Sequence, residues 1–157
     1  MWRHLVQVLA VVLVAGACHG RQPGYDSPTA VAEAYVAAIR AGDADQAGNL
    51  FPSPDVIRAA QHCEAGKVDG LADGVEEARA HLLADLAASR LLEPEFVSSR
   101  ESERELPLSM EACRTGPDVL IVGMAESVSV LRGGQRNVEM RKITVVRLAG
   151  RWYLASA

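Results

Sequence analysis

Glu126 is the residue of this 157-residue chain whose position most strongly suggests chemistry. A carboxyl group buried on the apolar face of a strand would have a raised pKa and could bind a ligand or act as a base. The alternative, which we favour from the sequence, is that a β-bulge or a bend in the strand turns Glu126 to solvent. Glu126 interrupts an alternating apolar pattern that is typical of one strand face, made by Leu120, Val122, Met124, Val128 and Val130.

Tyr35 and His81 are two further side chains with chemical potential. Tyr35 lies in the apolar stripe of an expected helix and could offer its hydroxyl group to a ligand in a pocket, although packing in the core is the favoured interpretation. His81 directly precedes Leu82, an inward position of another expected helix, so its side chain should point to solvent. The chain offers no clear pair of an acidic residue and a histidine, and the sequence therefore predicts no catalytic residue.

Three cysteines, Cys18, Cys63 and Cys113, divide into one candidate for lipidation and one candidate pair. If Cys18 carries lipid, an even number remains, and in an oxidising compartment Cys63 and Cys113 would most often bond to each other. The alternative is that Cys63 is an unpaired, buried thiol on the apolar face of a helix. No C-x-x-C or H-x-x-x-H spacing accompanies the cysteines or His62 and His81, so we expect no metal and no other cofactor.

Residues 1–17 have the three-part layout of a secretory signal peptide, with Arg3, an apolar run over 5–14 and the small residues Ala15-Gly16-Ala17. The apolar run and the small residues after it, 5–17 together, are too short for a membrane span, because ~13 residues cover about 20 Å of a hydrocarbon core roughly 30 Å thick. The small residues followed by Cys18 resemble the bacterial lipobox, although Leu is usual where Ala15 stands. Ordinary signal peptidase would cut at the same bond.

These features predict a signal peptide over 1–17, a lipidated Cys18 with a polar tether over 18–26, and a single domain over 27–157. The expected location is the cell envelope, outside the cytoplasm, on the outer membrane or the periplasmic face if the host has two membranes. The membrane is thus an expected partner through the lipid anchor.

The charge balance argues against nucleic acid as a partner. The chain has 16 Lys and Arg against 20 Asp and Glu, a net charge of −4, whereas nucleic-acid binding needs a basic surface. Its only basic group is modest. That group consists of Arg132, Arg136, Arg141 and Lys142.

Four helices are expected in the first half of the chain, because each candidate carries an apolar stripe and most begin at an N-cap residue. The third is expected to carry Cys63 on its apolar face, and the fourth to turn Val75, Leu82 and Leu86 inward. The expected helices cover 28–41 after Ser27, 43–51 with Asp43 as N-cap and Pro52 after it, 54–63 after Ser53, and 71–92.

Past Pro94 the sequence changes to β-forming residues with a period of two. We expect a polar edge strand over 95–106, the strongest strand over 119–131, its partner over 138–148 and a last strand over 151–157. Gly133-Gly134 is typical of a hairpin turn, because both glycines accept a positive φ. Helices followed by an antiparallel meander predict an α+β fold.

Two segments resemble bacterial lipoprotein members of the nuclear-transport-factor-two-like superfamily, whose domains are cystatin-like. These are SPTAVAEAYVAAIRAGDADQAGNLF, similar to its first two helices, and VVRLAGRWYLAS, similar to its final hairpin. Together they cover about a quarter of the chain. The resemblance implies N-terminal helices packed on a curved antiparallel sheet in a cone, with a pocket between them.

The resemblance leaves the function open, because the superfamily includes isomerases, dehydratases, polyketide cyclases, transport factors and lipoproteins. We expect a non-enzymatic envelope lipoprotein that binds another envelope protein or peptide, or a small apolar ligand. The alternative is a small enzyme of the isomerase or polyketide-cyclase type with Glu126 or His81 as its base, which an acid in a closed apolar pocket would favour. A homodimer through the open sheet face is compatible with either function.

Overall fold

The computed structural model describes residues 24–63, 70–105, 113–115 and 119–157. The expected signal peptide, Cys18 and most of the tether lie outside the described residues. The described tether residues are held against the domain: the N–H of Tyr25 donates to the carbonyl of Trp152 and the N–H of Trp152 to that of Tyr25, both at 2.9 Å. Arg151 also pairs with Asp26 and donates to the carbonyl of Gly24.

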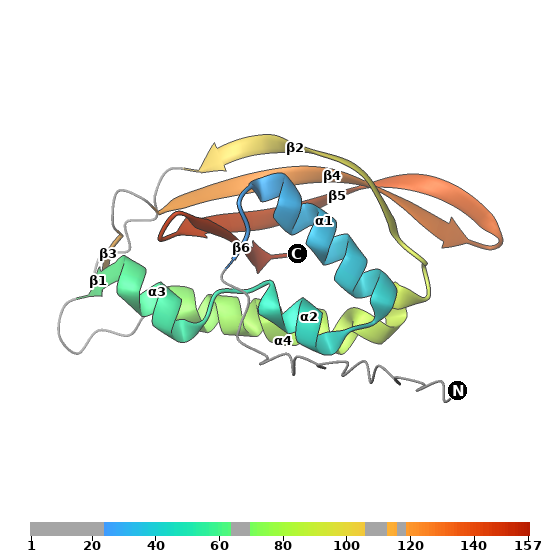
Figure 1. Ribbon diagram of the computed structural model, residues 1–157. Helices are drawn as coiled ribbons and strands as arrows, with labels where there is room; N and C mark the ends of the chain where they lie inside the picture. The colour runs from blue at the N-terminus through green and yellow to red at the C-terminus, as the bar shows by residue number, and fades with distance from the viewer. Residues whose placement is uncertain (1–23, 64–69, 106–112, 116–118) are drawn as a thin grey trace, which may run out of the picture.

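The domain has one layer of helices and one layer of sheet (Figure 1). The helices are α1 (Pro28–Ala41), α2 (Ala44–Asn49), α3 (Pro54–Ala60) and α4 (Gly70–Arg90). An open antiparallel sheet with strand order β2-β4-β5-β6 forms the other layer. Its strands are β2 (Glu95–Glu105), β4 (Leu120–Arg132), β5 (Gln135–Leu148) and β6 (Arg151–Ser156). The predicted α+β class is confirmed.

The helix starts follow the predicted capping signals. Ser27, Asp43 and Ser53 are the N-caps of α1, α2 and α3, and each side chain accepts a hydrogen bond from the backbone N–H three residues later. Gly42 ends α1 with a φ of 66°, in the left-handed region that glycine adopts without strain.

The expected third helix is shorter than predicted, and the prediction that Cys63 lies on it is wrong. α3 ends at Ala60, and Gln61–Cys63 forms the strand β1, which pairs antiparallel with β3 (Cys113–Thr115). The spacing of Ile57, Ala60 and Cys63 fits a helix, but pairing with a distant segment overrides this local pattern. The two-stranded sheet was not expected from the sequence.

The register of the main sheet is set by tight turns. β4 and β5 are joined through Gly133 and Gly134, with φ of 57° and 79°, and pair without interruption from Arg132↔Gln135 to Leu120↔Arg147. β5 therefore begins directly after the turn rather than at the expected Val138. β2 is an edge strand, as predicted, and has two register shifts against β4.

α1 is the helix that organises the core, because it lies against all four strands of the main sheet and against α2 and α4. Its buried residues include Val31, Val36 and Ile39. Near the start of β4 both faces of the sheet are buried, since Ile121, Val122, Val145 and Val146 are all at most 3% exposed. Toward the β4–β5 hairpin only the face that meets α1 is buried.

Candidate functional site

The structure buries Glu126 completely, with an exposed fraction of 0%. The interpretation that a bulge turns it to solvent is therefore wrong. The register shifts fall on β2, between Phe96 and Ser98 and between Glu101 and Glu103, whereas β4 and β5 pair without a break around Glu126. Unbroken alternation keeps Glu126 on the same face as Met124 and Val128.

Three elements surround Glu126 with polar side chains. Arg141 of β5 and Ser99 of β2 are its direct cross-strand partners, and such partners place their side chains on the same face. This face meets α1, because the hydroxyl of Ser99 donates to Oγ1 of Thr29 at 3.3 Å. Tyr35 of α1 interacts electrostatically with both Glu126 and Arg141. We call Glu126, Arg141 and Tyr35 the internal polar cluster.

Glu126 is the least satisfied member of the internal polar cluster. Neither carboxylate oxygen has a hydrogen-bond partner among the described residues. Burial raises the pKa of Glu126 to about 7, against a smaller opposing effect of the Arg141 charge. The guanidinium of Arg141 also lies 3.7 Å from the Glu139 carboxylate, so its charge is shared between Glu139 and Glu126. A carboxyl group with a pKa near neutrality is suited to accept and return a proton.

Tyr35 is 7% exposed and packs in the core, as the favoured interpretation held. Its pKa is raised, first by burial and then by the charge of Glu126, while the charge and a hydrogen bond of Arg141 act in the opposite direction. The phenol therefore stays neutral at physiological pH and can both donate and accept a hydrogen bond.

The internal polar cluster lies among packed, buried side chains. Three surface depressions, of about 540, 380 and 250 Å³, are formed by described residues, and neither Tyr35 nor Glu126 lines any of them. The first lies beside Arg90 and Leu91, the second between α1 and Phe96, and the third over β2, β4 and β5.

His81 does not belong to the internal polar cluster. Its side chain is 77% exposed on α4, and its Nε2 lies 3.8 Å from the carboxylate of Glu77, itself 76% exposed. The prediction that His81 points to solvent is confirmed.

The backbone places Cys63 and Cys113 directly opposite each other in the β1–β3 pair. Directly opposed residues in antiparallel strands have Cα atoms about 4.5–5.5 Å apart, within the range of roughly 4.4–6.8 Å that disulfides require. The disulfide stays a prediction, now with a structural basis. Within the described part of the chain no three His, Cys, Asp or Glu side chains are grouped as metal ligands.

Sequence reasoning missed Arg141, although a signal for it exists. In a two-residue hairpin, residues equally distant from the turn lie opposite each other. Glu126 and Arg141 are each seven residues from the nearer glycine of Gly133-Gly134. The predicted turn therefore already implied that Glu126 and Arg141 lie opposite each other, as they do in the β4–β5 register.

None of the described helices is both long and apolar enough to cross a membrane. Comparison of the chain with protein-family models, with curated proteins and with solved structures found no match.

Proposed function

We propose that this chain is an envelope lipoprotein, anchored through Cys18, whose nuclear-transport-factor-two-like domain works by binding a protein or peptide. The observation that carries the binding role is the distribution of exposed apolar side chains. Val138 and Met140 of β5 are 64% and 60% exposed, and Val97 in the nearby β2 bulge is 54% exposed. Apolar side chains grouped on one exposed face are typical of an interaction surface.

The inner face of the sheet supports the same proposal by contrast. The buried residues of α1 pack against this face, and Glu126 and Tyr35 of the internal polar cluster are buried there. A domain whose cone is filled by its own side chains has less room for a substrate than one with an empty apolar cavity. Binding on the outside is the role that this arrangement favours.

Two features support an anchored domain outside the cytoplasm. The opposed cysteines of β1 and β3 suit an oxidising compartment. The chain also enters the domain at a firmly held point, because residues 24–26 are bound to β6 through Tyr25 and Arg151. A short polar segment from Cys18 to residue 24 would then hold the domain close to the bilayer.

The anchor is tested by intact mass of the protein extracted from membranes, comparing wild type with Cys18→Ala and with Cys113→Ala. We expect the wild-type mass to equal the chain from Cys18 plus acyl groups, and the Cys18→Ala protein to lose both acylation and membrane association. Cys113→Ala serves as the matched control and should stay acylated. An unacylated wild-type chain in the soluble fraction would exclude the lipoprotein proposal.

A second candidate, an enzyme of the isomerase or polyketide-cyclase type with Glu126 as its base, is favoured by one observation. Glu126 is a buried carboxyl with a pKa of about 7 and, within the described part of the chain, without a hydrogen-bond partner, which is the state expected of a general base waiting for substrate. The proposal requires that small molecules reach this carboxyl.

Access to Glu126 is tested by labelling the native protein with a water-soluble carbodiimide and glycine ethyl ester and mapping the products by mass spectrometry. Labelling of Glu126 would show that the interior opens to solutes and would favour the enzyme. Protection of Glu126, while the exposed Glu77 in the same sample is fully labelled, would count against it.

A further inference from the structure

The outward face of β2, β4 and β5 holds a trough whose floor consists of small side chains. On β4, Gly123, Ala125, Ser127 and Ser129 share this face, and Ala125 is the one of them that is buried. Longer side chains stand on both sides, from β2 and from β5. The central part is the depression of about 250 Å³, which we call the outer trough; it is lined by Ser98, Ser99, Arg100, Ala125, Ser127 and Met140.

Two cations flank the outer trough in one cross-strand row. Arg100 of β2 and Lys142 of β5 are both direct partners of Ala125. Their backbones are therefore about 9.5 Å apart, two strand spacings, and only a methyl group stands between them. Long flexible side chains from both sides can converge on one anionic group seated over Ala125.

Among the described residues these two cations have no acidic partner, in a chain whose net charge is −4. In the described part of the chain, neither Arg100 nor Lys142 takes part in a salt bridge. By comparison, the guanidinium of Arg40, which borders both other depressions, lies 3.5 Å from the Glu95 carboxylate. Two cations without a described acidic partner therefore flank the outer trough.

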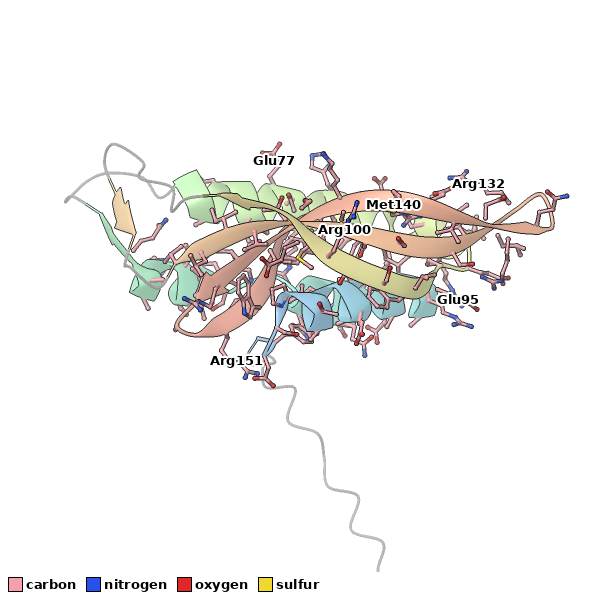
Figure 2. The ribbon with its side chains drawn as sticks, turned by 90° about the horizontal axis from the view of Figure 1, so that it is seen from above. Glu77, Glu95, Arg100, Arg132, Met140 and Arg151 are labelled. Atoms are coloured by element: carbon pink, nitrogen blue, oxygen red, sulfur yellow. The ribbon has the colours of Figure 1, made fainter. Side chains whose placement is uncertain are left out.

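The next cross-strand row offers the apolar side chain of Met140 and the hydroxyl group of Ser127. Met140, 60% exposed, lies opposite Ser127, whose hydroxyl donates to the Met140 sulfur at 3.1 Å. A thioether is a weak acceptor, so a carboxylate would be a better partner for this hydroxyl. Figure 2 looks onto this face, where Arg100 and Met140 lie close together.

We propose that the outer trough binds an acidic segment of a partner protein, with an Asp or Glu carboxylate between Arg100 and Lys142 and an apolar side chain on Met140. The proposal rests on the proposed binding function and specifies its partner. Arg and Met are enriched in protein interfaces, and complementary charge sets the specificity of such contacts.

The size and position of the trough favour a protein segment over other anions. Its volume is below the roughly 300–1,000 Å³ of pockets that enclose a small-molecule ligand, and it is open along the sheet face. The first described residues lie at the opposite edge strand, where Tyr25 pairs with β6. A bilayer and a second copy of the chain are alternative occupants that the experiment distinguishes.

The probe is a displayed library of random heptapeptides, selected on the full chain purified in nonionic detergent. We expect enrichment of peptides with Asp or Glu next to an apolar residue. For a selected peptide, fluorescence polarisation should show a Kd weakened about tenfold by Arg100→Gln/Lys142→Gln, since each exposed charge contact contributes at most ~1 kcal/mol. The matched control, Arg58→Gln/Arg90→Gln, removes two exposed arginines elsewhere and should leave the Kd unchanged.

Several results would overturn the assignment while leaving the lipoprotein proposal intact. One is a selection without acidic enrichment, and another is a Kd indifferent to Arg100 and Lys142. A dimer in sedimentation experiments that Met140→Glu dissociates would assign the trough to a second copy. Binding to phosphatidylglycerol vesicles by a Cys18→Ala chain, lost in the double variant, would assign it to anionic lipid. Circular dichroism checks that each variant is folded.

Discussion

Among single residues, the charge of Glu126 is decided by two opposing effects. Burial disfavours the carboxylate, and Arg141 across the strand favours it. The desolvation effect is larger, because the carboxyl makes no hydrogen bond to a described residue and the Arg141 guanidinium also interacts with Glu139 and Tyr35. Removing a buried charge without a full counter-ion is expected to stabilise a fold.

Glu126→Gln should therefore change the pH dependence of stability. The folded protein keeps the Glu126 proton up to about pH 7, whereas a free Glu loses it near 4.5. Between these values the folded state holds more protons than the unfolded state, so the free energy of unfolding falls as pH rises and then levels off. The free energy of unfolding of Glu126→Gln, measured relative to that of the wild type, should therefore be roughly 2–3 kcal/mol higher at about pH 8 than at about pH 5.

The measurement is urea unfolding of both proteins at the two pH values. Tyr35→Phe is the control, because it alters the same cluster but keeps the carboxyl and should keep most of the wild-type slope. A difference between Glu126→Gln and wild type that is equal at both pH values would show that Glu126 is already ionised in the folded state.

At the scale of elements, the β1–β3 pair joins two segments that lie on either side of α4 and β2 in the sequence. Three residue pairs form it, with Cys63 opposite Cys113 at one end. Pairs of strands this short contribute little by themselves. A covalent bond between them would instead restrict the unfolded chain over the long intervening segment.

We predict that reduction lowers the stability of the wild-type protein and that Cys63→Ser/Cys113→Ser reproduces the reduced state. A bond that closes a loop of about 50 residues stabilises by about 4 kcal/mol in the loop-entropy description. Guanidinium unfolding with and without reductant measures the difference, and the double variant should be insensitive to reductant. Two titratable thiols in the untreated native protein, at Cys63 and Cys113, would contradict the bond.

At the scale of the whole molecule, a single helix connects the parts. α1 lies against every strand of the main sheet and against α2 and α4, and the carbonyl of Leu50, just after α2, accepts a hydrogen bond from the N–H of Leu154 in β6 at 2.9 Å. Helices and sheet therefore share one core rather than two separable ones.

This shared core predicts one cooperative transition that a single change in α1 weakens throughout. Ile39 is 1% exposed. Its replacement by Ala should lower the free energy of unfolding by about 2–5 kcal/mol. Far-UV and near-UV circular dichroism should shift together in Ile39→Ala, because the helices and the sheet unfold as a unit. Glu33→Ala, on the exposed side of the same helix, should change stability by less than about 0.5 kcal/mol. Separate transitions for the two signals would contradict a single core.

Local interactions explain what could be predicted from the sequence. The N-caps of α1, α2 and α3 depend on hydrogen bonds to the third residue onward, and the β4–β5 turn on two adjacent glycines. Such interactions are complete within a few residues, so the pattern of residue types contains them. The α+β order, the edge strand and the exposed position of His81 follow from the same local periodicities.

The tertiary structure alone decided the features on which the proposed functions rest. The strand at Cys63 exists because a distant segment pairs with it, against a local helical pattern. Glu126 is buried because α1 covers its face, while the identical alternation of β4 leaves the outer trough open on the other side. Alternation tells which residues share a face, but packing between distant elements determines which face is covered.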